Sequence, residues 1–218
     1  PTSAARSPAS ARAPSSGGEA SDPYTTLAHP IGQPAAMTAI SDRYRRLAAE
    51  ITRRVEAVPP DRWDAPSPCA GWSARDVLQH LIDSHRSMPG YVGIPVELAL
   101  SVDDDPPGAW AEARDVMQEL LDDPDQAGLE YDGYFGRTSL ERTVDGFLGF
   151  DLVVHGWDIA RATGQDETLP PDEVERIWAD AQQMGDNLRL DGVCGPPVPI
   201  SGDAPLQDRL IALLGRTP

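Results

Sequence analysis

Residues 150–164, FDLVVHGWDIARATG, place polar side chains where a buried helix is normally apolar. At about 100° per residue, Asp151 and His155 lie roughly 40° apart, on the same side of a helix as Leu152 and Ile159. Burying a charged group costs several kcal/mol or more unless another group pairs with it. The stretch therefore predicts a helix whose polar pair meets a partner from elsewhere in the chain.

Further helices are indicated by apolar periodicity together with start and stop signals. Apolar residues at helical spacing predict a helix over 37–58, which a double proline ends. Ser73, followed three residues later by Asp76, is close to a capping box and starts a second helix that reaches about Met88. Other helices are expected over 108–123, from about 139 to 163, from Pro171 onward and within 203–218.

Taken together, the pattern predicts an all-α fold. Residues 130–140 are expected to form an irregular or short extended connection, and other strand signals are few. Four or five helices of this length favour a helix bundle, with an additional short C-terminal helix. Residues 37–218 are long enough for one domain with a real core. Residues 1–36 are rich in Pro, Ser, Ala and Gly, which predicts a disordered N-terminal extension, and Met37 is interpreted as the natural start.

Charge and composition exclude several kinds of partner. The net charge is −17, and all 18 basic residues are arginine. Without basic runs the chain lacks the footprint of a nucleic-acid-binding protein, and its acidic character disfavours anionic membranes. No apolar run approaches the ~18 residues of a membrane span, and no secretory signal is visible. We therefore expect a cytoplasmic monomer or homodimer whose partners are small molecules, with no nucleic acid and no membrane.

The two cysteines do not indicate a metal site of their own. Cys69 and Cys194 lie far apart without C-x-x-C spacing, which excludes a structural zinc site built on cysteine. The sequence leaves open whether they form a disulfide, and reduced thiols are the expectation. Cys69 precedes a predicted helix N-terminus, where a thiolate would be stabilised. More often such a cysteine is a small buried hydrophobe.

Asp151 and His155 suggest a metal site. An acid and a histidine four residues apart on one helix direct their ligand atoms to one point, as H-x-x-x-H pairs do with divalent metals. A third ligand would come from another helix, where the predicted domain offers His80 and His85. His85 lies near the centre of its helix's apolar stripe, so periodicity alone favours it over His80. The alternative is a buried ion pair of Asp151 and His155 with Arg161 or another arginine.

Three motifs occur in order at residues 67–83 (SPCAGWSARDVLQHLID), 151–166 (DLVVHGWDIARATGQD) and 203–218 (DAPLQDRLIALLGRTP). The first resembles the PC-x-GW turn and the following helix, ending in HL, of the mycothiol-dependent maleylpyruvate isomerase N-terminal family, within the DinB-like superfamily. The second resembles that family's later ligand helix. The third is similar to the tail of its actinobacterial single-domain members. Together the motifs span nearly all of residues 37–218.

This resemblance implies a DinB-like four-helix bundle in which His80, Asp151 and His155 hold one divalent metal. As the third ligand it implies His80 and not His85, because the motif histidine of the family directly precedes the sequence Leu-Ile-Asp, residues 81–83 here. Where this chain has Asp151 and His155, the isomerase is similar to an E-x-x-x-H motif. Aspartate is one methylene shorter than glutamate, so Asp151 would hold the metal nearer the helix or through water. The isomerase also carries a further C-terminal domain, so we expect a substrate other than maleylpyruvate.

The implied ligand set suggests the chemistry. Two neutral imidazoles and one carboxylate leave a +1 site with open positions, which is typical of catalytic zinc. Zinc is the first expectation, and nickel, cobalt or iron accept the same ligands. The resemblance implies mycothiol or a similar low-molecular-weight thiol as cosubstrate, which such a cation would deprotonate. The predicted function is a thiol-dependent transferase or isomerase acting on a small electrophile. The alternatives are a non-catalytic metal- or ligand-binding bundle in stress response or detoxification, and a purely structural helical scaffold.

Neighbouring residues have less specific interpretations. Asp158 either fixes the tautomer of a ligand histidine from outside the metal site or pairs with Arg161 at helical spacing. Trp72 and Trp157 are expected to be core or cleft-wall aromatics. If His80 is the ligand, His85 is a packing or hydrogen-bonded histidine.

Overall fold

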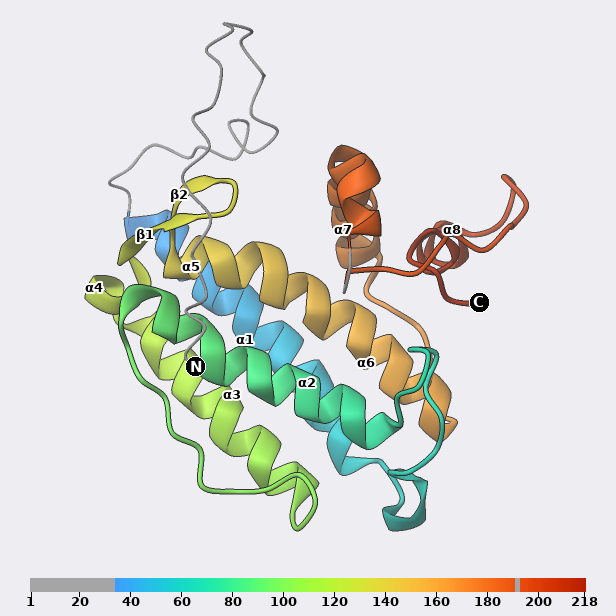
Figure 1. Ribbon diagram of the computed structural model, residues 1–218, viewed down its shortest axis with the longest axis horizontal. Coiled ribbons are helices and arrows are strands. Elements are labelled where there is room, and N and C mark those ends of the chain that lie inside the picture. Colours follow the sequence, from blue (N-terminus) through green and yellow to red (C-terminus); the bar gives the residue numbers. More distant parts are fainter. Residues whose placement is uncertain (1–33, 191–192) are drawn as a thin grey trace, which may run out of the picture.

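The computed structural model describes residues 34–190 and 193–218 and consists mainly of helices (Figure 1). Four of them form a bundle: α1 (Pro34–Glu56), α2 (Ala74–Ser87), α3 (Pro106–Asp122) and α6 (Gly149–Thr163). Helix α1 packs against α3 and α6, and α2 packs against the same two helices, so the four close a ring around one core. The predicted all-α bundle is confirmed.

The order of the helices decides which side chains can meet. Helices α2 and α3 run in the same direction, because residues 88–105 return along the length of the bundle (Figure 1). This connection begins with the 3-10 helix η3 (Met88–Val92). Helices α2 and α6 are neighbours that run in opposite directions. His80 of α2 is thereby brought next to Asp151 of α6.

The bundle helices begin and end at the residues that the sequence marks. At the start of α2, the Ser73 side chain accepts a hydrogen bond from the Asp76 amide and the Asp76 side chain accepts one from the Ser73 amide, a complete capping box. At the end of α6, Gly164 has a φ of 76°, a left-handed conformation that glycine adopts without a steric penalty. Both features confirm predicted helix ends.

The core lies between the four bundle helices. Each contributes fully buried apolar side chains, among them Ile51, Leu78, Met117 and Leu152. Helices α1 and α6 approach closely at Gly156, where an added Cβ would lie only 2.9 Å from Ile51 Cδ1. A larger residue there would require the Ile51 side chain to shift.

The segment before α6 is more varied than a single helix. Residues 130–140 contain an antiparallel hairpin of β1 (Glu130–Gly133) and β2 (Gly136–Ser139), which confirms the short extended connection. The chain then continues through α5 (Leu140–Thr143) and a π-helical turn, η4 (Val144–Leu148), directly into α6. Such π turns inside helices are frequent at functional sites.

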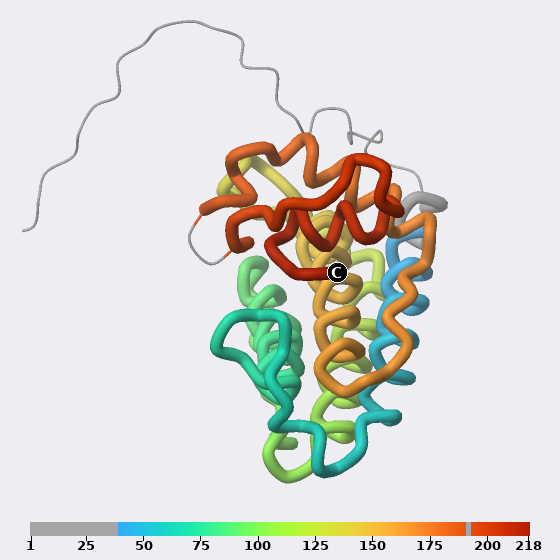
Figure 2. Tube along the Cα trace, turned by 90° about the vertical axis from the view of Figure 1, so that its right-hand side faces the viewer, coloured from blue at the N-terminus to red at the C-terminus, as the bar shows by residue number. Residues whose placement is uncertain are grey.

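The C-terminal part covers one side of the bundle. It contains α7 (Pro171–Met184), the 3-10 helix η5 (Gly185–Arg189) and α8 (Leu206–Leu213), coloured orange to red in Figure 2. Helix α7 packs against α8 and is tied to α1 by Arg43, whose buried guanidinium donates to both carboxylate oxygens of Glu173. Two short elements, η2 (Pro60–Arg62) and α4 (Pro124–Ala127), complete the described helices.

The N-terminal boundary differs from the prediction. Helix α1 begins at Pro34, three residues before Met37, where the sequence predicts the helix to start. Residues 1–33 of the predicted disordered extension, including His29, lie outside the described residues. Among the described helices, none combines the length and the apolar character needed to span a membrane.

Candidate metal centre

The three residues singled out as ligands come together between α2 and α6. His80 projects from α2, and Asp151 and His155 project from successive turns of α6. His80 Nε2 lies 3.5 Å from Asp151 Oδ2, and His155 Nε2 lies 4.0 Å from Asp151 Oδ1. One ligand atom from each residue lies within 4.8 Å of the other two. We call these three residues the His–Asp cluster.

The cluster is half-buried beneath an aromatic side chain. Trp72, which lies just before α2, stacks on the ring of His155 at a centroid distance of 6.1 Å and contacts His80 at 5.2 Å. The side chain of His80 is 36% exposed and that of His155 only 10% exposed. The Asp151 carboxylate is hydrogen-bonded to His80 and raises the pKa of this imidazole. Trp72 is thus a cleft-wall aromatic, and the buried Trp157 belongs to the core.

The second nitrogen of His155 is held from behind by a buried carboxylate. His155 Nδ1 lies 2.9 Å from Asp158 Oδ2 in hydrogen-bonding geometry, so Nε2 is the nitrogen that faces Asp151. Asp158 is fully buried and also accepts two hydrogen bonds from Arg216, at 3.0 and 2.8 Å. Burial by itself would raise the pKa of Asp158, but the bonds from His155 and Arg216 outweigh it and lower this pKa to about 2.

This geometry decides between the two interpretations of Asp158. The carboxylate contacts His155, as a tautomer-fixing partner would, and its arginine is Arg216 near the C-terminus. Arg161 instead pairs with Glu167, at 3.0 Å, and lies over the ring of Trp157. Sequence analysis missed Arg216 altogether, because helical periodicity gives no information on a contact between residues 58 positions apart.

Cys69 contacts the same oxygen of Asp158 as His155 does. Its Sγ is 3.2 Å from Asp158 Oδ2 and 3.2 Å from Arg216 Nη2. Burial and the Asp158 charge raise the pKa of the thiol to about 12 in spite of Arg216. The structure therefore favours a neutral, half-buried thiol over a reactive thiolate. Cys69 and Cys194 are both free, as expected.

A second group of potential ligand atoms overlaps the first. Cys69, His155 and Asp158 also present atoms within 4.8 Å of one another. In this group, however, Asp158 is already neutralised by the Arg216 guanidinium, which would repel an added cation. Within residues 34–190 and 193–218, the ion pairs of Asp151 are with His80 and His155 and with no arginine, and so the His–Asp cluster is the better candidate.

His85, which periodicity alone favoured, is not part of the cluster. Its Nδ1 lies 2.7 Å from the Leu81 carbonyl oxygen and its Nε2 lies 2.9 Å from the Tyr44 hydroxyl, with an edge-on contact to Trp110. Burial lowers the pKa of His85 to about 4, so the ring is neutral. The stripe argument failed because the centre of α2's apolar stripe faces the core, whereas its flank faces the cleft beside α6.

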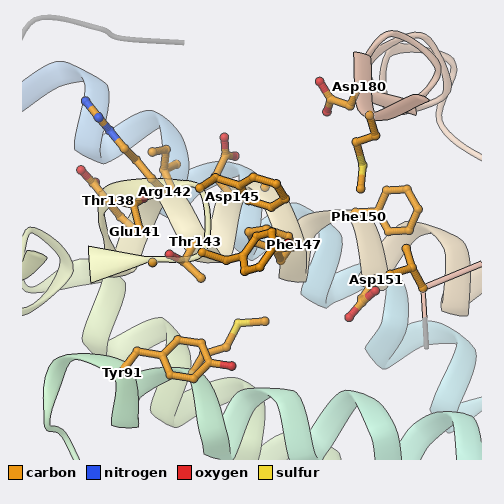
Figure 3. A pocket seen from close by; sticks show the side chains of 18 of the residues that line it. Tyr91, Thr138, Glu141, Arg142, Thr143, Asp145, Phe147, Phe150, Asp151 and Asp180 are labelled. Carbon is orange, nitrogen blue, oxygen red and sulfur yellow. The ribbon is translucent and has the colours of Figure 1, made fainter. Parts of the chain in front are cut away.

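The His–Asp cluster lies in the wall of a large cavity. The cavity encloses about 2760 Å³, which exceeds the needs of one small ligand. It extends from the cluster along η4 and α5 and beneath α7 (Figure 3). Phe150 and Asp151 lie at one end of the view, and Thr138, Glu141 and Arg142 lie at the other (Figure 3). A ligand in this cavity can therefore reach the cluster.

The fold and the cluster place this protein in one class: all-α, DinB-like helical bundles with histidine and carboxylate side chains at an interhelical cleft. The sequence profile of the mycothiol maleylpyruvate isomerase N-terminal domain family matches residues 44–160, and the chain belongs to this family. The matched region contains the whole His–Asp cluster and Asp158. Arg216 lies outside it.

Two relatives from Mycobacterium tuberculosis are similar over most of the chain. The uncharacterized protein MT0763 of strain CDC 1551 / Oshkosh is 28% identical over 167 residues, which cover 73% of this chain and 88% of the relative. The uncharacterized protein Rv0738 of strain ATCC 25618 / H37Rv gives the same values. No solved structure gives a significant match.

Proposed function

We propose that this protein binds one divalent metal ion through His80, Asp151 and His155 and catalyses thiol-dependent transfer or isomerisation on a small electrophile. The observation that carries the proposal is the convergence of two imidazoles and one carboxylate from two helices on a single point. Family membership supports the proposed use of a thiol, because the family takes its name from a mycothiol maleylpyruvate isomerase.

The donor set fits a divalent ion, and its spacing is close to what one ion needs. Two atoms bound to one zinc ion at about 2.0–2.2 Å lie roughly 3.3–3.6 Å apart in tetrahedral geometry. The distance of 3.5 Å between His80 Nε2 and Asp151 Oδ2 matches this spacing, and the distance of 4.0 Å between His155 Nε2 and Asp151 Oδ1 is longer. The ligand atoms of the full group lie within 4.8 Å of one another and would have to move closer by up to roughly 1 Å to hold one ion. Zinc is the first candidate, while nickel, cobalt and iron also accept two nitrogens and one oxygen.

The residues around the cluster have definable tasks in such a site. Asp158 keeps the proton of His155 on Nδ1 and leaves Nε2 as a ligand atom. Arg216 holds Asp158 ionised, so that this carboxylate stays a hydrogen-bond acceptor. Trp72 covers the two imidazoles and limits access of water from one side. The half-exposed His80 edge leaves a path for ligands from the cavity.

The bound ion would supply Lewis acidity that lowers the pKa of a neighbouring thiol and so provides a thiolate at neutral pH. In the transfer reaction, the thiol sulfur forms a bond to the electrophilic carbon. The leaving group departs with the electron pair of its bond to that carbon, and the thiol proton is released to solvent. The cosubstrate is mycothiol or a similar low-molecular-weight thiol, since the half-buried Cys69 has a raised pKa and is neutral.

Metal analysis tests the ligand assignment. We expect close to one equivalent of divalent metal per chain in the wild-type protein, and a large loss in Asp151→Asn, because a neutral amide is a poor ligand in place of a carboxylate. The matched control is Asp180→Asn, which removes a carboxylate from the same cavity but outside the cluster. Near-stoichiometric metal in Asp151→Asn would refute the assignment.

Turnover separates an enzyme from a binding protein. The metal-loaded protein is incubated with mycothiol and either chlorodinitrobenzene or a maleyl compound, and the rate is compared with that of the thiol alone. Acceleration that disappears in Asp151→Asn but not in Asp180→Asn supports catalysis. A rate equal to that of the thiol alone, across several electrophiles, would instead support the non-catalytic metal- or ligand-binding bundle.

A further inference from the structure

Exposed aromatic side chains gather at one place on this protein. Among the described residues, five large aromatic side chains are exposed, and all five line the cavity beside the His–Asp cluster: Trp72, Tyr91, Tyr134, Phe135 and Phe147. Exposed aliphatic residues, by contrast, also occur elsewhere, as Leu100, Leu129 and Ile200 show. Clustered apolar surface of this kind marks a binding groove, whereas scattered apolar residues need no explanation.

Four aromatic rings that line the cavity form two pairs in contact. Phe135 and Phe147 are stacked, with their planes 13° apart and their centroids 6.4 Å apart, and Tyr91 packs on Tyr131 at 5.4 Å. We call the part of the cavity lined by these four residues the aromatic groove. Phe147 precedes Asp151 by four residues in one continuous helical stretch, about one helical turn. Figure 3 shows Tyr91 across the cavity from Phe147.

The cationic side chains of the cavity are already engaged. Arg43 and Arg176 both donate to Asp145, and Arg43 also binds Glu173. Arg216 is bonded to Asp158, and Arg189 donates to two backbone carbonyl oxygens. A dicarboxylate ligand entering the groove would have to compete with these partners for each guanidinium.

Two carboxylates that line the cavity also disfavour an anionic ligand. Glu141 of α5 has one carboxylate oxygen, Oε2, buried without a hydrogen-bond partner among the described residues. Asp180 of α7 faces the cavity from the other side (Figure 3). Burial raises the pKa of both carboxyl groups, and the charges of Arg142 beside Glu141 and of Arg176 and Arg43 near Asp180 offset this effect only in part. Further negative charge between them is disfavoured, while an uncharged ligand meets no such penalty.

We propose that the aromatic groove binds a planar, uncharged aromatic electrophile and selects it over dicarboxylates such as maleyl compounds. The inference rests on the proposed function, because the groove would present this substrate to the thiol activated at the His–Asp cluster. Phe135 and Phe147 provide ring faces for stacking, and Glu141 and Asp180 provide the charge that rejects anions.

Isothermal titration calorimetry of the metal-loaded full-length chain, without thiol, tests the selection. The probes are dinitrobenzene, as the uncharged aromatic, and maleate, as the dicarboxylate. We expect measurable binding of dinitrobenzene and at least about tenfold weaker binding of maleate. Tighter binding of maleate, or no binding of dinitrobenzene, would overturn the proposal.

Variants assign the binding to the groove. Phe147→Ala removes one half-exposed ring of the stacked pair and is expected to weaken dinitrobenzene binding about fivefold or more. Leu100→Ala, which removes a similarly exposed apolar side chain outside the cavity, is the matched control and leaves binding unchanged. Glu141→Gln is expected to strengthen maleate binding and to leave dinitrobenzene binding unaltered. Equal effects of Phe147→Ala and Leu100→Ala would overturn the proposal.

Two further measurements, of metal content and of molecular mass, separate this inference from the alternatives. Metal content is measured on the same samples, so absence of dinitrobenzene binding to wild-type protein with full metal content refutes the groove alone. If the wild-type protein takes up no metal but binds dinitrobenzene in a way that needs Phe147, the metal site is refuted and the groove stands. Light scattering reports the mass of the chain. A dimer that Phe147→Ala dissociates would assign the groove to self-association and overturn the inference.

Discussion

Helix α2 carries two histidines, five residues apart, in opposite surroundings. His80 is partly exposed in the cavity, and its hydrogen bond with Asp151 raises the pKa of the imidazole. His85 is buried in the core between Tyr44 of α1 and Trp110 of α3, and burial lowers its pKa to about 4. The residue type and the helix are the same, so the difference comes entirely from the face of the helix that each residue occupies.

The comparison shows which features would allow a histidine to bind a metal and which of them His85 lacks. Both ring nitrogens of His85 have hydrogen-bond partners, the Leu81 carbonyl and the Tyr44 hydroxyl, so a metal would have to displace one of them. His80 points one nitrogen at a carboxylate and retains exposed surface. A buried, fully bonded imidazole stabilises the fold, whereas a half-exposed imidazole beside a carboxylate is available for binding.

The largest expected difference between the two histidines is in metal binding. His80→Ala should lower the affinity for zinc by more than the ~10–100-fold that loss of an outer hydrogen-bond partner costs, because a ligand itself is removed. His85→Gln, which changes a histidine of the same helix outside the cluster, should retain wild-type affinity. Competition with a chromophoric chelator measures both. Comparable losses in the two variants would mean that the helix, and not the cluster, determines binding.

Stability should show the reverse order. In metal-free protein, His85→Ala should lower the free energy of unfolding by about 2–5 kcal/mol, because it leaves a cavity and removes a partner of the buried Tyr44 hydroxyl. His80→Ala should change it by less than about 1 kcal/mol, since its ring is partly exposed. Urea unfolding followed by circular dichroism gives both values. A larger loss in His80→Ala would contradict the contrast.

The pH dependence of stability isolates His85. Its pKa is about 4 in the folded state and near 6.5 in an unfolded chain, so below pH 6.5 the unfolded state binds more protons. The contribution is fully present above pH 6.5 and is lost as pH falls toward 4, by roughly 3 kcal/mol at most. Subtracting the unfolding profile of His85→Gln from that of the wild type cancels the other titrating groups. A flat difference between pH 4 and 6.5 would refute the assignment.

The hydrogen-bond partners of His155, in the cluster, and of His85, in the core, provide the smallest test. Asp158→Asn should weaken metal binding about 10–100-fold, because the amide no longer fixes the His155 tautomer. Tyr44→Phe removes the corresponding partner of His85 and should leave metal affinity unchanged, while lowering stability by about 1 kcal/mol. Zinc titration, with circular dichroism to verify folding, checks both. Unchanged affinity in Asp158→Asn would show that this carboxylate has only a structural task.

Local signals predicted most of the helices well, and the exceptions have local causes. The Ser73 capping box and the left-handed Gly164 occur where the sequence places them, because both depend on contacts within one or two turns. The π-helical turn at Val144–Leu148 and the start of α1 at Pro34 were not predicted. A π turn keeps a helical pattern of apolar residues, so periodicity does not reveal it.

By itself, the sequence determined that this is an all-α bundle and that Asp151 and His155 share one helical face, since both follow from a fixed helical repeat. It did not determine which histidine of α2 faces them, and only the family motif favoured His80. Tertiary structure decided that α2 and α6 run in opposite directions and that Arg216 bonds Asp158. It also decided that the exposed aromatic rings line one cavity. Contacts between distant segments depend on how all the helices pack at once, which no local repeat encodes.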